Sequence, residues 1–250
     1  MSAALATSGP MDFPPEHRSQ SRSHVGRARK VNEDRVLDRP DRALWAVADG
    51  MGGHRGGDIA AEIAIAALRD LADDPAPITE AAIAAALRQA NAAILERGAA
   101  VGGVIGSTVV VLHIADSVAH LFWAGDSRAY RAEAGAWRQL TRDHSFVQEL
   151  LDQGLISHGD AENHPRAHVI TRALGVDAEV ELECRSLPLL GNDVLLLCSD
   201  GLSRSLAAET PDDLDRFDRQ IADFLLDAAL RNDGSDNISF VVVSATGAAA

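Results

Sequence analysis

The sequence predicts an α+β fold in which a β-sandwich carries helices on its outside. Two helical stretches come early, strands follow, and mixed elements complete the chain, so helices and strands do not alternate as in a parallel βαβ sheet. The 250 residues suffice for a sizeable core, and 46% hydrophobic with 24% charged residues is typical of a globular protein in water. No apolar run reaches the roughly 18 residues of a membrane helix, so we expect no membrane association.

The first half of the chain predicts two strands and a pair of helices. The strands span 35–37 and 43–47, and the second runs into an Asp-Gly pair. A helix is predicted over 58–72, where apolar side chains recur every four residues. A second helix begins near Thr79, which suits an N-cap, and stops at Gly98. The two alanine-rich helices are expected to form an antiparallel pair that covers a sheet.

The second half of the chain predicts mainly strands. Apolar, β-branched and aromatic residues predict them at 108–114, 118–123, 128–131, 194–198 and 238–243. Helices are predicted at 145–153 and 220–230, with an irregular polar segment at 155–165. The folded domain is expected to span 23–244, between disordered tails at 1–22 and 245–250.

Composition excludes several classes of function. A net charge of −14 disfavours nucleic-acid binding, which depends on neutralising phosphates. Lys30 is the only lysine, against 22 arginines, and it lies neither in a Gly-Lys-Ser/Thr loop nor beside a kinase-type glycine loop. Cys184 and Cys198 lack CxxC spacing and fit a reducing cytoplasm, which is the localisation we expect.

Aspartates mark the ends of the predicted strands. One precedes the first strand, three follow strands and adjoin a glycine, and one precedes the last strand: Asp34, Asp49, Asp126, Asp200 and Asp236. Each alone is explained as a turn residue. Together they can converge at one edge of a sandwich, where they would repel one another and protonate unless cations held them. Oxygen ligands without paired cysteines or histidines favour Mg²⁺ or Mn²⁺ over zinc.

Such a site suits phosphoryl transfer. Two ions about 4 Å apart can hold a water, lower its pKa and clamp the attacking and leaving oxygens. Arg29, three residues before Asn32, can offer a bidentate guanidinium to the phosphate, although most surface arginines are merely solvated.

Two other interpretations of the glycine motifs are weaker. Gly125-Asp126-Ser127 imitates an esterase motif with Ser127 as nucleophile, but no Asp-x-x-His occurs in the chain to complete it. The glycine cluster at 50–57 imitates a phosphate-binding loop, but Arg55 breaks G-x-G-x-x-G.

Eight stretches in one order resemble the PPM (type 2C) metal-dependent Ser/Thr phosphatases in their compact, stand-alone bacterial form. The resemblance covers about 23–244 and rests on GRARKVNED at 26–34, VADGMGGH at 47–54, GST at 106–108, GDSR at 125–128, LTRDHS at 140–145, ITRALG at 170–175, CSDGL at 198–202 and DNI at 236–238.

The resemblance implies a four-layer αββα sandwich and a site with two or three Mn²⁺ or Mg²⁺ ions. It implies that Asp49 bridges two metals, that the Gly50 carbonyl binds one of them, and that Asp200 and Asp236 bind the other. Asp126 resembles the residue that holds a third, weaker metal in bacterial members.

The resemblance also implies the reaction. Glu33 and Asp34 would orient metal-bound waters, Arg29 would bind the substrate phosphate, and a metal-activated water would attack phosphorus directly, without a phosphoenzyme. Phosphorylated proteins and a cognate Ser/Thr kinase are the implied partners, and we expect a monomer. In some bacteria such a kinase–phosphatase pair regulates type VI secretion.

The chain departs from the family pattern in two places. Met51 stands where some members carry a histidine proposed as general acid, and His54 nearby is more simply a loop residue. Ala167-His168 replaces Arg-Asn or Arg-Ser beside the 155–165 segment, the mobile flap of the family, so substrate preference does not transfer. The alternative function is a non-catalytic phosphoprotein-binding regulator, which would have lost metal-binding aspartates; here all are present.

Overall fold

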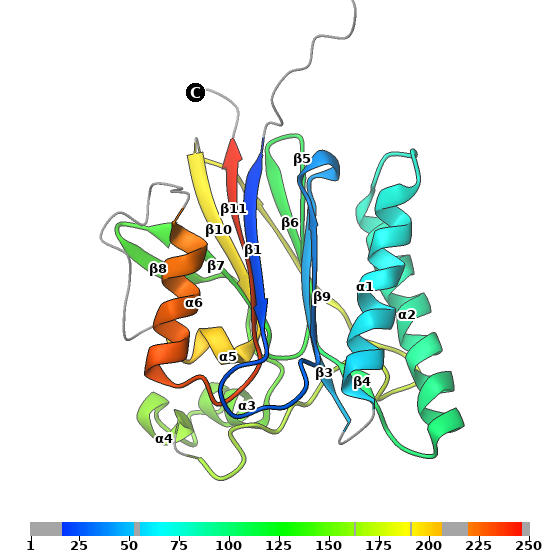
Figure 1. The fold of residues 1–250 in the computed structure, drawn as a ribbon, viewed down its shortest axis with the longest axis vertical. Coiled ribbons are helices and arrows are strands. Elements are labelled where there is room, and N and C mark those ends of the chain that lie inside the picture. Colours follow the sequence, from blue (N-terminus) through cyan, green and yellow to red (C-terminus); the bar gives the residue numbers. More distant parts are fainter. Residues whose placement is uncertain (1–16, 53–55, 163, 191, 207–219, 247–250) are drawn as a thin grey trace, which may run out of the picture.

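The structure is a computed structural model that describes residues 17–52, 56–162, 164–190, 192–206 and 220–246. Two antiparallel sheets lie face to face between helices, which gives four layers (Figure 1). The α+β sandwich expected from the sequence is therefore confirmed. In the described part of the chain, no helix is long and apolar enough to cross a membrane.

The first sheet joins the two ends of the described chain. Its order is β1 (Arg18–His24), β11 (Ile238–Thr246), β10 (Asn192–Cys198), β7 (Arg128–Glu133) and β8 (Ala136–Gln139). Residues 18–22, expected in a disordered tail, lie in β1 and pair with β11. β11 also continues past 244, so the folded domain extends beyond the expected 23–244 on both sides.

The second sheet carries the early strands. Its order is β2 (Asp34–Arg39), β3 (Leu44–Met51), β5 (Val109–Ala115), β6 (Val118–Ala124) and β9 (Glu183–Pro188), and β4 (Gly106–Ser107) pairs with β3. A short 3₁₀ turn, Pro40–Arg42, links β2 to β3.

Helices cover both outer faces. α1 (Gly57–Asp73) and α2 (Glu80–Val101) form the expected pair on the second sheet, and the Thr79 side chain accepts a hydrogen bond from the amide of Ala82 as the predicted N-cap. α6 (Ile221–Asn232) covers the first sheet. α3 (Phe146–Asp152), α4 (His158–Glu162) and α5 (Asp200–Ser203) gather at one end of the sandwich (Figure 1).

Alternation along the strands builds the three cores between these layers. On β3, Leu44 and Ala46 face α1, whereas Trp45 and Val47 face the other sheet. On β10, Leu195 and Leu197 enter the same inter-sheet core. Successive side chains of a strand point to opposite faces, so this parity also decides where the residues beyond the apolar rows point.

Seven elements of the described chain are absent from the prediction. The sequence did not predict β1, β4, β8, β9, α4, α5 or the 3₁₀ turn Pro40–Arg42, and α4 lies within the 155–165 segment that was expected to be irregular. His54 and most of the two tails lie outside the described residues.

Candidate active site

Two carboxylates end the apolar rows between the sheets. Asp34 begins β2 and Asp49 lies near the end of β3, and the two are direct cross-strand partners. Asp34 continues the row of Val36, and Asp49 continues the row of Trp45 and Val47, all of which contribute to the inter-sheet core. Both side chains therefore point into the space between the sheets, at the end where α5 lies.

Among the candidate aspartates, Asp34 has the smallest exposed surface, at 2%. Its Oδ2 accepts a hydrogen bond of 2.9 Å from the hydroxyl of Ser199, across the gap between the sheets, while Oδ1 has no hydrogen-bond partner. Burial, with the charges of Asp200 and Asp236, raises the pKa of Asp34 to about 7 despite that hydrogen bond. A buried carboxylate with unmet hydrogen-bonding capacity attracts a cation or a proton.

Asp49 is fixed through its peptide group. Its N–H donates to Oγ1 of Thr108 at 3.2 Å, and its carbonyl accepts from the Thr108 amide at 2.9 Å and from the Ser107 hydroxyl at 3.1 Å. Burial raises the pKa of Asp49, and the neighbouring charges of Asp34 and Asp200 raise it further. The Gly-Ser-Thr motif thus holds the backbone and leaves the carboxylate free.

Gly50 lies where three segments meet. Its amide donates to the Glu33 carbonyl at 3.3 Å, and a Cβ at this position would lie 2.0 Å from the carbonyl oxygen of Gly57. Only glycine permits this approach between β3 and the start of α1. Glu33 thereby lies beside the strand end that carries Asp49.

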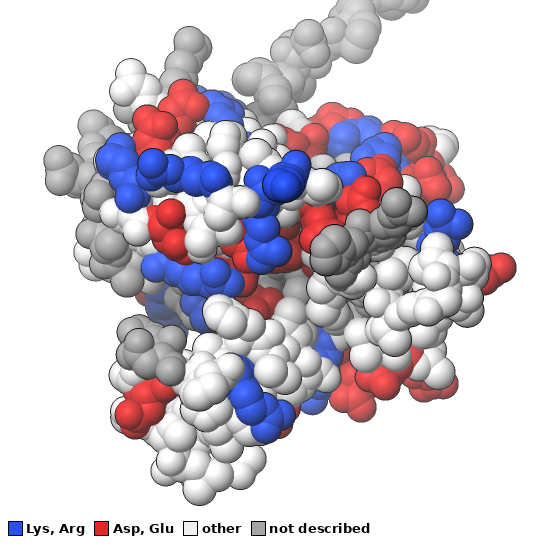
Figure 2. Space-filling view, turned by 60° about the horizontal axis from the view of Figure 1, so that its bottom comes forward, with Lys and Arg blue, Asp and Glu red and all other residues white. Residues whose placement is uncertain are grey.

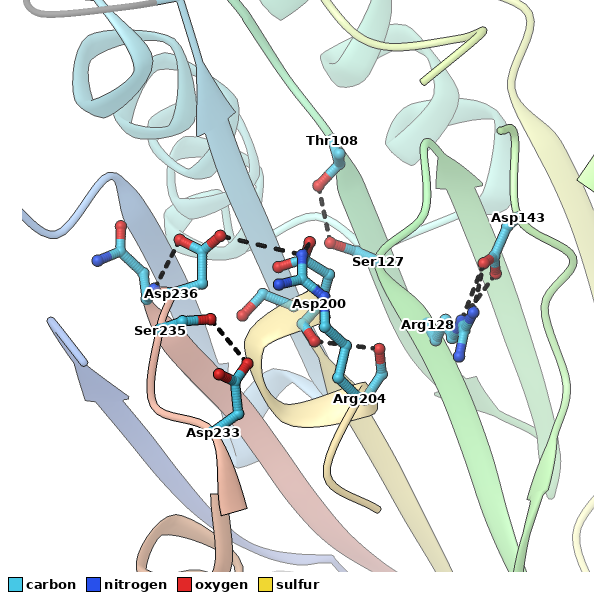
Figure 3. A network of polar contacts seen from close by, with 12 residues as sticks. Thr108, Ser127, Arg128, Asp143, Asp200, Arg204, Asp233, Ser235 and Asp236 are labelled. Carbon is cyan, nitrogen blue, oxygen red and sulfur yellow. Dashed lines mark hydrogen bonds and ion pairs between the residues drawn. The ribbon is translucent and has the colours of Figure 1, made fainter. Parts of the chain in front are cut away.

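Asp126 follows β6 at the turn into β7. The turn is held by His144, whose Nδ1 accepts from the Gly125 amide at 3.1 Å and whose own amide donates to the Gly125 carbonyl at 2.9 Å. A further hydrogen bond holds the turn, because the hydroxyl of Thr108 lies 2.7 Å from that of Ser127 (Figure 3). Burial, with the charge of Asp200, raises the pKa of Asp126 to about 7.

Asp200 and Asp236 come from the first sheet. Asp200 opens α5, separated from the end of β10 by Ser199 alone, and Asp236 immediately precedes Asn237 and β11. A Cβ on Gly201 would lie 2.0 Å from the carbonyl oxygen of Asn237, so the two strand ends touch backbone to backbone. Burial raises the pKa of Asp200, the Arg204 charge lowers it and that of Asp236 raises it, and Oδ1 of Asp200 is buried without a hydrogen-bond partner.

Arg29 lies on the loop between β1 and β2. Its Nη2 donates to Oδ2 of Asp236 at 2.8 Å, and 52% of its side chain is exposed. Hydrogen bonding to Asp236 raises the pKa of Arg29, so this guanidinium stays charged. Seen from this end of the molecule, basic and acidic side chains stand close together despite the net charge of −14 (Figure 2).

Asn237 holds that loop against β11. Its Oδ1 accepts from the Glu33 amide at 2.8 Å, and its Nδ2 donates to the carbonyls of Val25 at 2.9 Å and Val31 at 3.0 Å. One side chain thus fixes the start and end of the segment that carries Arg29.

The donor set fits Mn²⁺ or Mg²⁺. Two buried carboxylate oxygens lack hydrogen-bond partners, and carboxylates that raise one another's pKa bind hard cations. Among the residues that the structure describes, no three Asp, Glu, His or Cys side chains already lie close enough together to hold a metal ion. The carboxylates of Asp200 and Asp236 instead contact Arg204 and Arg29.

The structure brings the sequence-predicted residues to one end of the sandwich. Those residues are Arg29, Glu33, Asp34, Asp49, Gly50, Asp126, Asp200 and Asp236. Sequence reasoning assigned no role to Ser199, Asn237, Thr108 or Arg204. The first three lie within motifs already noted, whereas nothing in the sequence pattern singled out Arg204.

This architecture, with carboxylates gathered at one end of two packed sheets, is that of the metal-dependent phosphatases. The profile of the family "Protein phosphatase 2C" matches residues 21–234. The chain belongs to the protein phosphatase 2C family of protein serine/threonine phosphatases.

Individual relatives agree with this family. The chain is 38% identical over 239 residues to the serine/threonine phosphatase stp of Listeria welshimeri, covering 90% of this chain and 94% of that one. It resembles the structure of PppA, a key regulatory component of T6SS in Pseudomonas aeruginosa, at 39% identity and a TM-score of 0.78, covering 91% and 96% of the two chains. It also resembles the catalytic domain of the phosphatase PstP in complex with two manganese ions, at 36% identity and a TM-score of 0.75, covering 91% and 97%.

Proposed function

We propose that this chain removes phosphate from phosphoserine and phosphothreonine in proteins, using Mn²⁺ or Mg²⁺ held by its aspartates. One observation carries the proposal. Five aspartates from strand ends far apart in sequence gather at one end of the sandwich, and carboxylate oxygens of two of them are buried without hydrogen-bond partners. Carboxylates in such a cluster either take up protons or bind cations, and cations are what keep them ionised at neutral pH.

The proposed ligands are the carboxylates of Asp49, Asp200 and Asp236 and the Gly50 carbonyl, with Asp126 for a third, weaker ion. When bound, the ions polarise phosphoryl oxygens and lower the pKa of water so that it becomes a nucleophile at neutral pH. Asp34 and Glu33 accept hydrogen bonds from water in the site. The Ser199 hydroxyl fixes Asp34 for this task through its bond to Oδ2.

Arg29 is proposed to bind the phosphate. Its guanidinium is charged, more than half exposed and close to Asp236, so it can offer two parallel N–H donors to phosphoryl oxygens. Met51 pairs with Gly106 across β3 and β4 and carries no transferable proton. The leaving hydroxyl is therefore protonated by water rather than by the residue after Asp49-Gly50.

The proposed context is bacterial signalling in the cytoplasm. Phosphorylated proteins are the substrates, a cognate Ser/Thr kinase supplies them, and the chain acts as a monomer. The similarity to stp supports phosphorylated proteins as the substrates, because stp spans nearly the same length and carries the name of a serine/threonine phosphatase.

The decisive experiment is phosphate release from a phosphothreonine peptide by metal-stripped protein. We expect release on addition of Mn²⁺ and none in EDTA, with the Asp49→Asn variant inactive in both conditions. Folding is checked by circular dichroism in each sample. No release from folded protein in Mn²⁺ or Mg²⁺ would instead favour a phosphoprotein-binding regulator without turnover.

A further inference from the structure

Arg204 lies at the mouth of the site on the first turn after β10. It is the C-cap of α5, four residues after Asp200, and its Nη2 forms an ion pair with Oδ2 of Asp200. The same nitrogen is 3.9 Å from Oδ2 of Asp236. Figure 3 shows the side chain reaching toward both carboxylates, and 34% of it remains exposed.

Arg29 approaches the same carboxylate oxygen from another element. Its Nη2 lies 2.8 Å from Oδ2 of Asp236, the oxygen that Arg204 also faces. Two guanidinium groups, one from the β1–β2 loop and one from α5, thus flank a single oxygen. Both side chains are partly exposed, so a ligand at the mouth of the site can reach both.

The ion pair of Arg204 is poorly explained by helix stability alone. α5 has only four residues, and a partly exposed i,i+4 ion pair adds little to the stability of so short a helix. The position of the charge is more informative. A guanidinium on Asp200 competes with any cation for that carboxylate, and a guanidinium near a phosphoryl group binds its oxygens as it binds a carboxylate.

We propose that Arg204 is a second phosphate-binding residue that acts with Arg29. When divalent cations occupy Asp200 and Asp236, both guanidinium groups lose their carboxylate partner and face one anion together. The phosphoryl group of the substrate, and the inorganic phosphate released from it, occupy the position between them. This inference rests on the proposed function and deepens it, because it assigns a residue that contacts the substrate.

The inference predicts effects of opposite sign in one variant. In Arg204→Gln, the affinity for Mn²⁺ should increase several-fold, because a competing cation is removed from Asp200. The affinity of the Mn²⁺-loaded protein for inorganic phosphate should fall about tenfold, the KM for a phosphothreonine peptide should rise similarly, and kcat should change less. A merely structural role for Arg204 would weaken both Mn²⁺ and phosphate binding and lower the melting temperature.

Two further variants complete the test. Arg204→Lys keeps the charge but not the planar fork, so its phosphate affinity should lie between those of the wild type and Arg204→Gln. Arg69→Gln removes an arginine on α1 that is ion-paired to Glu62 at 3.3 Å, and it should behave as the wild type. Mn²⁺ binding and phosphate binding are measured by titration calorimetry, and turnover is measured separately.

The binding measurements separate this inference from the proposed function. Phosphate that binds the loaded wild type and Arg204→Gln equally well would overturn the role of Arg204, whatever the turnover. Phosphate binding that depends on Arg204 in a protein without turnover would retain the role and refute the proposed activity. Absence of phosphate binding to the Mn²⁺-loaded wild type would also overturn the inference.

Discussion

Asp34 and Asp49 lie directly opposite each other on β2 and β3, with both side chains turned into the space between the sheets. Like charges at directly opposed positions of an antiparallel pair are destabilising. Here the repulsion is increased by burial, because Asp34 is only 2% exposed and its Oδ1 has no partner. This repulsion lowers the stability of the metal-free protein, and it favours the binding of cations that would relieve it.

This arrangement predicts that the metal-free protein loses stability as pH rises. The pKa of Asp34 is about 7 in the folded protein and 3.8 ordinarily, so the folded state binds this proton more tightly than the unfolded chain does. The stabilising contribution is complete below about pH 4 and is lost as pH rises through about 7, by up to roughly 1.4 kcal/mol per pH unit. Asp126, whose pKa is also raised to about 7, adds in the same direction.

Urea unfolding in EDTA near pH 5 and near pH 8 measures this effect. We expect the higher free energy of unfolding near pH 5, and a smaller difference between the two pH values in Asp34→Asn. Mn²⁺ should restore stability chiefly near pH 8, where the carboxylates are ionised. Equal stability at both pH values without metal would contradict the prediction.

Replacing one of the carboxylates proposed to bind metal should abolish turnover without unfolding the protein. Asp49→Asn and Asp200→Asn each remove one ligand charge, and loss of the metal's contribution lowers kcat on the order of a thousandfold or more. Both variants should be at least as stable as the wild type in EDTA, because each relieves repulsion in the cluster. Asp70→Asn, the same change on the exposed face of α1, is the matched control; near-normal rates in both site variants would refute the assignment.

Arg29→Ala tests phosphate binding by the β1–β2 loop. We expect KM to rise about tenfold while kcat falls less, because the guanidinium contacts the phosphate in both the ground state and the transition state. Arg29→Lys should recover part of the loss, since a lysine keeps the charge but not the bidentate geometry. Steady-state kinetics with a phosphothreonine peptide measures both variants, and an unchanged KM in Arg29→Ala would remove this residue from the site.

The sequence predicts the buried half of the fold better than its edges. Helices α1 and α2 and the central strands show apolar periodicity because they face a core. Of the strands missed, β1, β8 and β9 each form an end of a sheet, and β4 has only two residues, which pair with β3. β1 reads RSQSRSH and contains no apolar residue, because it is held by backbone pairing to β11 rather than by a buried row.

A similar limit applies to the site. Asp49 and Asp200 could be predicted because each follows a long apolar strand and precedes a glycine. Ser199 and Asn237 form hydrogen bonds to residues far away in sequence. Their roles could therefore be recognised only once the packing of the two sheets was known. Arg204 carries no sequence signal at all, because its importance depends on where Asp236 lies.

Replacing Asn237 can distinguish an effect on stability from an effect on catalysis, because Asn91 provides a matched control. Asn237 is 6% exposed and makes three side-chain hydrogen bonds to the backbone of the loop that carries Arg29 and Glu33. Asn91 is 2% exposed and makes three as well, accepting from the Gly175 amide and donating to two carbonyls beyond it. Of these two sets of hydrogen bonds, only that of Asn237 lies at the candidate active site.

Both Asn237→Ala and Asn91→Ala should lower the free energy of unfolding by about 1–3 kcal/mol, because each leaves buried backbone groups without partners. Asn237→Ala should in addition raise KM several-fold and lower kcat in samples shown to be fully folded, because Arg29 and Glu33 lose their fixed position. Asn91→Ala should keep both kinetic constants near wild-type values. Urea titration and phosphopeptide kinetics on the same samples decide the matter: equal kinetic losses in the two variants would mean that Asn237 acts on the fold alone.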